Sequence, residues 1–337
     1  MRKRATSARS RAEAVHGWII LDKPLGLSSA GAVARVTGLA RRAGWGKVKV
    51  GHGGTLDPLA TGVLPIALGE ATKLSGRLLD AVKGYAFTVR FGEATATDDL
   101  EGAVVATSDV RPTLAEVEAV LARFTGDIAQ TPPAYSAIKV DGERAYARAR
   151  AGEVVAMAER RVTIHLLTLG PALSLVADAA CPSPADAGEG NVQRSGARER
   201  EGALESVALE VLCSKGTYVR SLARDIALAL GTVGHVSALR RTRAGPFVLA
   251  HAHTLDNAQL LCDAHRLADI VLPLTAGLDD IPALAVTPEE AALLRQGRRL
   301  RGRSGRSGLH LALAGDTPVA LVEVTSQEVR VERGFNL

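Results

Sequence analysis

The spacing of apolar residues along the chain predicts strands and helices in mixed order. Residues 85–91 and 207–213 alternate between more and less apolar positions, which is the period of a strand with one buried face. Tyr85 lies on the apolar face of the first strand, together with Phe87 and Val89. Because strands and helices do not alternate strictly, we predict an α+β fold with a mixed, largely antiparallel sheet flanked by helices.

Two amphipathic helices have recognisable ends. One is predicted to start at Thr113, because Thr113 and Glu116 have the spacing of a capping box ahead of an apolar stripe. The other is predicted to be capped by Thr217 and to end at Gly231, a natural helix terminator. Arg220 then lies in the first turn, where the helix dipole disfavours a cation. We therefore expect Arg220 to have a partner elsewhere in the chain.

Changes in composition predict how the chain is divided. Residues 1–14 are basic and lack apolar periodicity, so we expect a disordered arm. Residues 15–270 are predicted to form the main domain, interrupted by insertions at 127–155 and 176–203. The second insertion is rich in Ala, Gly, Ser and Pro and is predicted to be a flexible loop. Residues 281–337 contain short alternating runs that indicate a small β-rich terminal domain.

The loop from Gly51 to Gly62 is the clearest candidate for chemistry. In it a single carboxylate, Asp57, is framed by four glycines, a histidine and Pro58. Glycines permit backbone conformations closed to other residues, and Pro58 fixes the dihedral just after Asp57. Such a loop either presents the acid to a ligand or is a structural turn in which Asp57 caps the next element. The loop alone does not decide between these two interpretations.

Several motifs together resemble the tRNA pseudouridine-55 synthases, which isomerise one uridine in the T-loop of tRNA. They are Gly17 to Ser29, Gly51 to Lys73, Lys83 to Tyr85, Pro132 to Lys139, Lys215 to Arg220 and His235 to Arg241. The resemblance covers most of residues 16–245, and several motifs in order are far more specific than any one. It implies that residues 127–155 grip RNA like a thumb. Residues 281–337 separately resemble a small PUA-type domain that would support RNA binding, with a β extension of the main domain as the alternative.

The resemblance implies catalytic roles for Asp57, Tyr85 and Arg220. Asp57 matches the catalytic aspartate, Tyr85 the active-site tyrosine, and Arg220 the arginine that forms a salt bridge with the aspartate. A carboxylate suits either attack on ribose C1′ or abstraction of a 2′ proton, and the sequence does not choose between them. A guanidinium would keep the acid ionised and fix its direction. From position alone, Tyr85 would be a packing residue.

Seven further residues are candidates for substrate binding on the same resemblance. His52 matches the histidine that fills the T-loop once the target nucleotide has flipped out, although a solitary loop histidine is usually only a partly exposed residue. Leu239 matches a pocket position, but an amphipathic helix would also have a leucine there. Asp99 is a weaker candidate for an ordering role, with a solvated acidic turn as the alternative. The remaining candidates are Lys23, Lys73, Tyr218 and Arg240.

The distribution of charge suits an RNA partner. The 41 Lys and Arg residues exceed the 36 Asp and Glu residues by five, and the positive charge is clustered. The clusters are residues 2–11, 240–243 and 295–306, and within the last one Arg298 to Arg306 are the expected RNA contacts. Charge runs are more often solvated faces than binding sites, but three of them favour contact with phosphate.

The remaining expectations concern location, cofactors and partners. The sequence has no apolar run long enough for a membrane span and no secretory leader, and its three cysteines are scattered. We therefore expect a cytoplasmic monomer that acts on tRNA without metal, cofactor or obligate protein partner. A metal cluster around Cys262 and His265 is a weak alternative. Two other functions stay open, namely a guide-RNA-dependent pseudouridine synthase subunit and a noncatalytic RNA-binding or RNA-folding protein.

Overall fold

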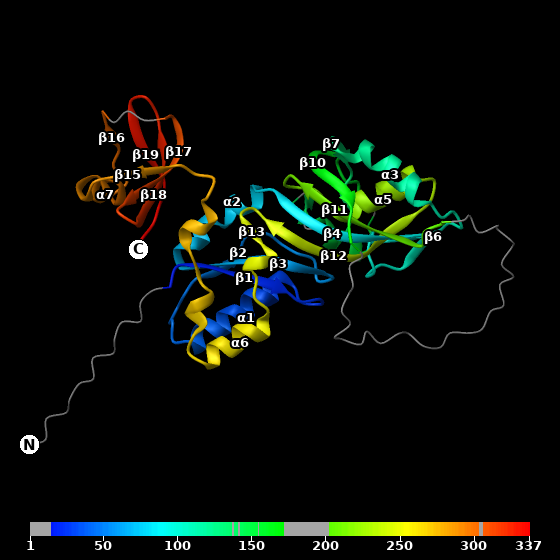
Figure 1. The fold of residues 1–337 in the computed structure, drawn as a ribbon, viewed down its shortest axis with the longest axis horizontal. Helices are drawn as coiled ribbons and strands as arrows, with labels where there is room; N and C mark the ends of the chain where they lie inside the picture. The colour runs from blue at the N-terminus through cyan, green and yellow to red at the C-terminus, as the bar shows by residue number, and fades with distance from the viewer. Residues whose placement is uncertain (1–14, 137, 141, 154, 172–201, 303–305) are drawn as a thin grey trace, which may run out of the picture. The chain divides into compact units, whose positions relative to one another are not determined.

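The computed structural model describes most of the chain as two compact units. The described residues are 15–136, 138–140, 142–153, 155–171, 202–302 and 306–337. One unit comprises residues 1–81 and 243–337, and the other comprises residues 82–242. The predicted arm at 1–14 and nearly all of the predicted insertion at 176–203 lie outside the described residues. Figure 1 labels most of the strands and α-helices of both units.

The first unit contains a buried antiparallel sheet. Strand β1 (Gly17–Lys23) pairs with β3 (Ala60–Leu68) and with the short β14 (Leu272–Pro273), and β2 (Val50–His52) pairs with β3. Helices α1 (Ser29–Arg42) and α6 (Leu255–Asp263) contact this sheet and each other. The shorter elements are η1 (Gly69–Leu74), α2 (Ser75–Asp80), β13 (Phe247–Val248), η3 (Leu249–His251), η4 (Leu267–Ile270) and η5 (Leu274–Gly277).

The C-terminal residues of this unit form a five-stranded sheet. Its strand order is β15 (Ala283–Ala285), β17 (Gly308–Ala314), β18 (Thr317–Val324), β19 (Glu328–Gly334) and β16 (Leu300–Arg301). Helix α7 (Pro288–Arg295) contacts this sheet and begins with a capping box between Thr287 and Glu290. Phe335 is buried in a hydrophobic cluster that also contains Trp18. The small β-rich C-terminal part that the alternation predicted is therefore confirmed.

The second unit contains the strands and helices that carry most of the predicted motifs. Its strand order is β12 (Gly234–Ala244), β4 (Lys83–Phe91), β11 (Ser206–Cys213), β10 (Arg160–Leu169) and β7 (Gly126–Gln130). The pairs β4–β11, β11–β10 and β10–β7 are antiparallel. Helices α3 (Leu114–Leu121) and α5 (Val219–Ala229) contact each other, and each also contacts a strand of this sheet. The shorter elements are β5 (Glu93–Thr95), β6 (Val104–Thr107), η2 (Ala122–Phe124), β8 (Lys139–Val140), β9 (Glu143–Arg144) and α4 (Ala145–Arg150).

The local predictions for this unit are mostly confirmed. Residues 83–91 and 206–213 are paired strands, and the capping box at Thr113 is present on α3. The predicted cap of α5 is wrong, because the N-cap is Tyr218 and the hydroxyl of Thr217 instead donates to the carbonyl of Ser214. Gly231 follows the end of α5 with a φ of 73°, a left-handed conformation that suits glycine, as predicted.

Leu239 lies on strand β12, so the helix considered for it is wrong. The run from Gly234 to Ala244 is too short and too mixed in polarity for its periodicity to separate a helix from a strand. Hydrogen bonding within the sheet decides between them, and sequence spacing does not report it. In the part of the chain that the structure describes, no helix combines the length and apolar character that a membrane span requires.

Candidate active site

The loop that carries Asp57 is held on its N-terminal side by Ser29. The Ser29 Oγ accepts a hydrogen bond from the N–H of Leu56 at 2.8 Å and lies 3.0 Å from the carbonyl oxygen of Leu56, to which it donates. Ser29 is buried in the first turn of α1, so these contacts are shielded from water. The N–H of Ala60 also donates to the carbonyl of Asp57 at 3.1 Å. The backbone on both sides of Asp57 is therefore fixed.

Lys23 holds the other side of the same loop. Its side chain is 0% exposed at the end of β1, and its ammonium donates to the carbonyls of Pro24, Leu27 and Pro58 at 2.9, 2.7 and 3.2 Å. A buried ammonium group needs such acceptors to offset the loss of hydration. The structure therefore places Lys23 as a support of the Asp57 loop, and its predicted contact with substrate stays a prediction.

His52 and the glycines around it give the loop its shape. The half-buried ring of His52 accepts a hydrogen bond at Nδ1 from the N–H of Gly54, at 3.4 Å. Gly54 has a φ of 136°, which residues with a side chain rarely adopt. A Cβ on Gly53 would lie 2.5 Å from Cδ1 of Leu78, so the chain packs too closely there for a side chain. The sequence prediction that these glycines serve a shaped turn is confirmed.

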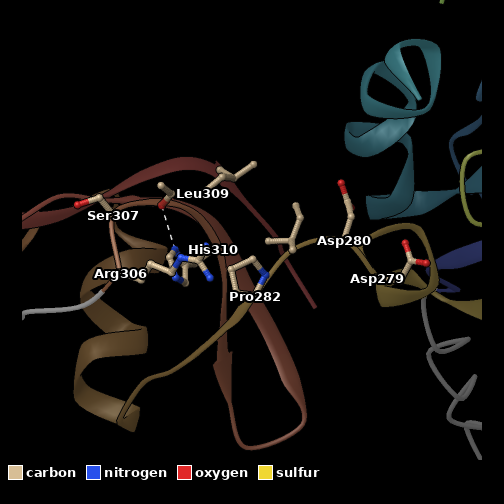
Figure 2. A pocket seen from close by; sticks show the side chains of 9 residues that line it. Asp279, Asp280, Pro282, Arg306, Ser307, Leu309 and His310 are labelled. Carbon is tan, nitrogen blue, oxygen red and sulfur yellow. Dashed lines mark hydrogen bonds between the residues drawn. The ribbon is translucent and has the colours of Figure 1, made fainter. Parts of the chain in front are cut away.

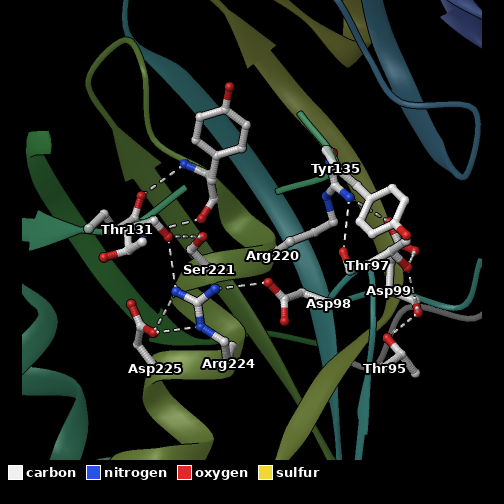
Figure 3. Close-up of polar contacts among 12 residues, drawn as sticks. Thr95, Thr97, Asp98, Asp99, Thr131, Tyr135, Arg220, Ser221, Arg224 and Asp225 are labelled. Atoms are coloured by element: carbon white, nitrogen blue, oxygen red, sulfur yellow. Dashed lines mark hydrogen bonds and ion pairs between the residues drawn. The ribbon is translucent and has the colours of Figure 1, made fainter. Parts of the chain in front are cut away.

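Arg220 lies in the second unit and forms an ion pair with a buried aspartate. Its Nη1 donates to Asp99 Oδ2 at 3.0 Å and to the carbonyl of Thr97 at 2.9 Å, and its Nη2 donates to the carbonyl of Tyr135 at 3.0 Å (Figure 3). The side chains of Arg220 and Asp99 are 8% and 9% exposed. The expectation that this cation has a partner outside its helix is therefore confirmed.

Asp99 is a structural part of this arrangement. Its Oδ1 accepts hydrogen bonds from the hydroxyl of Thr97 and, at 3.0 Å, from the N–H of Glu101. Its carbonyl accepts from the hydroxyl of Thr95 at 2.6 Å. The alternative of a solvated acidic turn is wrong, because Asp99 is 6% exposed and fully engaged with its neighbours. A side chain fixed in this way can orient the Arg220 guanidinium.

The aromatic and apolar candidates also lie in the second unit. Tyr85 on β4 and Leu239 on β12 are both half-buried and pack against the same hydrophobic cluster. Tyr218 is tied by Gln130, whose Oε1 accepts from the Tyr218 N–H at 3.0 Å and whose Nε2 donates to the Tyr218 carbonyl at 3.2 Å. Gln130 was not a candidate from the sequence, because no local pattern links two residues 88 positions apart.

The basic candidates are distributed over both units. Arg240 is half-buried on β12. Its neighbour Arg241 is 1% exposed, so this member of the basic cluster at 240–243 does not lie at the surface where a phosphate could contact it. Lys73 lies on η1, and its ammonium is 2.6 Å from Glu70 Oε2 and 2.9 Å from the carbonyl of Gly334. Its contact with RNA stays a prediction. So does the salt bridge between Asp57 and Arg220, since these residues belong to different units.

A pocket in the first unit lies next to the C-terminal basic cluster. Its lining carries both signs of charge, with Asp279 and Asp280 on the segment before β15 and Arg306 before β17 (Figure 2). His310 also lines it and is 6% exposed, with Nδ1 2.9 Å from the carbonyl of Gly308. Apart from Arg306, none of the predicted site residues lines this pocket. We therefore do not take it as the catalytic site.

Comparison with known proteins identifies the class of protein. Residues 42–174 match the model of the TruB family pseudouridylate synthase N-terminal domain. Residues 220–279 match the model of the tRNA pseudouridylate synthase B C-terminal domain. The first match contains Asp57 and Tyr85, and the second contains Arg220. The two matches define the class of protein as a pseudouridine synthase, which is an isomerase.

Full-length relatives identify the family. The chain is 56% identical over 323 residues to tRNA pseudouridine synthase B of Novosphingobium aromaticivorans, covering 96% of this chain and 98% of that protein. It is 51% identical over 331 residues to tRNA pseudouridine synthase B of Zymomonas mobilis, covering 98% and 99%. The chain belongs to the TruB family, and its activity is that of a tRNA pseudouridine synthase.

A solved structure shares the fold at greater evolutionary distance. A chain of the crystal structure of a Cbf5-Nop10-Gar1 complex superposes with a TM-score of 0.65 at 26% identity. The match covers 95% of this chain and 84% of that one. The predicted α+β fold with a β-rich C-terminal part is therefore confirmed both by the elements described and by this likeness.

Proposed function

We propose that the chain converts uridine to pseudouridine at position 55 in the T-loop of tRNA. The observation that carries this proposal is the Asp57 loop, in which Ser29 and Lys23 hold the residues on either side of one acid. Preorganisation of this kind suits an acid that must meet one reacting atom in a fixed geometry. A uridine within a folded loop has to leave its stack before its sugar can reach such an acid.

The reaction requires one bond to be exchanged for another on the same base. The bond between ribose C1′ and uracil N1 breaks, the base turns, C1′ bonds to C5, and C5 loses its proton while N1 gains one. Asp57 either attacks C1′ to form an ester or removes a ribose 2′ proton, and both routes need an ionised carboxylate. Arg220, whose direction Asp99 fixes, is proposed to keep that carboxylate charged.

The remaining candidates are proposed to hold the flipped nucleotide and the RNA backbone. Tyr85 is proposed to stack on the uracil, and a part for its hydroxyl in removing the C5 proton is the second role proposed for it. Leu239 packs against the base, and His52 fills the space that the nucleotide has left. The residues proposed to contact RNA are Lys73, Tyr218, Arg240 and Arg298 to Arg306. The buried Lys23 and Asp99 are proposed to support substrate binding indirectly, by holding the Asp57 loop and Arg220.

The proposed enzyme is a cytoplasmic monomer that needs neither cofactor nor protein partner. The solved structure that shares the fold is a complex that also contains Nop10 and Gar1. The high identity to bacterial tRNA pseudouridine synthases over nearly the full length favours a chain that acts by itself. Activity of the purified chain on tRNA alone distinguishes an enzyme that acts by itself from one that needs protein partners.

The direct test is incubation of the purified full chain with an unmodified tRNA transcript, followed by mapping of pseudouridine. Modification at position 55 is expected, and a transcript with cytidine at that position is expected to remain unmodified. An unmodified product, or a product modified only elsewhere, would overturn the proposal. The same assay with added guide RNA and partner proteins tests the alternative of a guide-dependent subunit.

A further inference from the structure

One face of α5 ties together two segments that are far apart in the sequence. Arg224 lies one helical turn after Arg220, so the two side chains project from the same side of the helix. The Arg224 guanidinium donates to Asp98 Oδ2 from Nη1, to the carbonyl of Thr131 from Nη2 and to Asp225 Oδ1 from Nε, each at 3.0 Å (Figure 3). One planar group thus binds three separate acceptors.

The carbonyl of Thr131 receives a second donor from the same helix. Ser221 is fully buried, and its hydroxyl donates to this carbonyl at 2.8 Å. On either side of Thr131, Gln130 is bonded to Tyr218 through its side chain, and the carbonyl of Tyr135 accepts from Arg220. Residues 130–135 are therefore attached to α5 mainly through side chains. They form the root of the 127–155 segment, which the resemblance assigns to RNA binding.

The acidic turn formed by Asp98 and Asp99 is also held by arginine side chains of α5. Arg224 pairs with Asp98, and Arg220 pairs with the next residue, Asp99. Asp98 has a φ of 59°, a left-handed conformation that costs free energy for a residue with a side chain, and its carbonyl accepts from the N–H of Val236 at 3.0 Å. Burial raises the pKa of the Asp98 carboxyl, and the guanidinium groups of Arg224 and Arg220 oppose that rise. The turn therefore depends on its arginine partners.

We propose that Arg224 is a positioning residue for the isomerisation of uridine in tRNA. By holding Asp98 and the carbonyl of Thr131 with one guanidinium, it fixes the root of the 127–155 segment on the helix that carries Arg220. The proposal rests on the proposed function and on the role that the resemblance implies for this segment, which is to grip tRNA. Loss of Arg224 then loosens the grip on tRNA more than it slows the chemical step, because Arg220 keeps its own bonds to Asp99 and Thr97.

The test is a comparison of KM and kcat for four variants on tRNA. Arg224→Met removes all three bonds, and Ser221→Ala removes only the hydroxyl that shares the Thr131 carbonyl. The double variant measures the coupling between them. Arg111→Met is the matched control, because Arg111 has the same 25% exposure, lies in the same unit and pairs with Glu205 at the surface. Hydrogen exchange of residues 130–136 reports order at the root directly.

The expected results separate positioning from a merely structural role. Arg224→Met is expected to raise KM about tenfold with kcat within about twofold, and Ser221→Ala to raise KM about threefold. The double variant is expected to raise KM by less than the product of the two, since both donors act on one carbonyl. Exchange at 130–136 is expected to accelerate in both single variants while α5 stays protected. The control is expected to match the wild type.

Other results would overturn the proposal. A fall in kcat at unchanged KM would mean that Arg224 acts through Arg220, and wild-type constants would mean that it does not act at all. If Arg224→Met does not fold, Ser221→Ala decides alone, and a wild-type KM for that variant counts against the proposal. An inactive wild type refutes the proposed function, whereas an active wild type with unaffected variants refutes only the role of Arg224.

Discussion

The Asp57 loop and the acidic turn that holds Arg220 are stabilised in different ways. Around Asp57, Ser29 and Lys23 bind peptide groups, so the shape of the loop is fixed through the backbone. At the acidic turn, Arg220 and Asp99 hold each other through opposite buried charges. In the first region the proposed chemical residue and its supports are separate residues. In the second region the proposed functional residue, Arg220, also stabilises the turn that holds it.

The largest effect on activity is expected from Asp57→Asn. The amide keeps the size of the side chain and leaves the contacts from Ser29 and Lys23 to the neighbouring backbone, but it cannot act as nucleophile or base. Pseudouridine formation is expected to fall by at least about 10³-fold. The melting temperature and the affinity for tRNA are expected to stay near those of the wild type, because RNA binding depends on backbone charge and shape. Substantial residual activity would exclude the proposed role of Asp57.

Arg220→Ala is expected to reduce activity and stability together. Its removal leaves the Asp99 carboxylate buried without its cation, which costs about 3 kcal/mol of the free energy of unfolding. The rate is expected to fall at least about 100-fold through loss of electrostatic stabilisation. Denaturant unfolding and single-turnover kinetics measure the two effects.

A double variant sharpens this second prediction. Replacing both partners, as in Arg220→Met with Asp99→Leu, removes the unpaired charge and is expected to recover part of the stability but none of the activity. Arg90→Ala, which breaks a pair whose side chains are 53% and 39% exposed, is the control and is expected to change stability by less than about 1 kcal/mol. Equal stability losses for Arg220→Ala and Arg90→Ala would contradict the difference between buried and exposed pairs.

A smaller effect is expected from Lys23→Met. The methionine fills a similar volume but leaves the carbonyls of Pro24, Leu27 and Pro58 without this donor, which costs about 2 kcal/mol of the free energy of unfolding. Activity is expected to fall about tenfold, because a loop that is free to shift misplaces the acid. Activity that falls as far as in Asp57→Asn, at unchanged stability, would mean that Lys23 contacts the substrate.

Much of this arrangement could be predicted from the sequence, because its signals are local. Alternation placed β4 and β11, the spacing of Thr113 and Glu116 placed the start of α3, and the glycine-rich loop around Asp57 showed itself by composition. The order of the motifs led to the family, and the two domain matches confirm it. Apart from the order of the motifs, these features depend on residues within about ten positions of each other.

The parts that were missed depend on distant pairs. Arg224 and Asp98 are 126 positions apart, and Gln130 and Tyr218 are 88 apart, so no periodicity joins them. The burial of Arg241 and Lys23 is also invisible in a sequence, because both read as ordinary surface cations until the fold surrounds them. Prediction therefore succeeded for features that a single helix, strand or loop determines. It failed where a side chain forms its hydrogen bonds with an element distant in the sequence.

The smallest effect is expected from Glu70→Gln, which tests a third and more exposed kind of contact. Burial disfavours the charged form of Glu70, but hydrogen bonds from Lys73 and from the N–H of Asn336 outweigh it and lower the pKa below the ordinary value of 4.5. A lowered pKa contributes stability that is present above pH 4.5 and is lost as the pH falls through the folded-state value. Because both side chains are partly exposed, the contribution is expected to be below about 1 kcal/mol.

The pH dependence of this last variant separates a charge effect from a packing effect. The wild type and Glu70→Gln are expected to differ in free energy of unfolding at pH 7 and to converge as the pH falls below the lowered folded-state pKa of Glu70, where Glu70 is protonated in both the folded and the unfolded chain. Glu332→Gln, in an exposed pair with Arg330, is the control and is expected to show little difference across the same pH range. A difference that does not shrink as the pH is lowered would show that Glu70 supports the segment around Asn336 by shape, as the backbone contacts support the Asp57 loop. Its disappearance would place Glu70 with Arg220 and Asp99, where charge determines the structure.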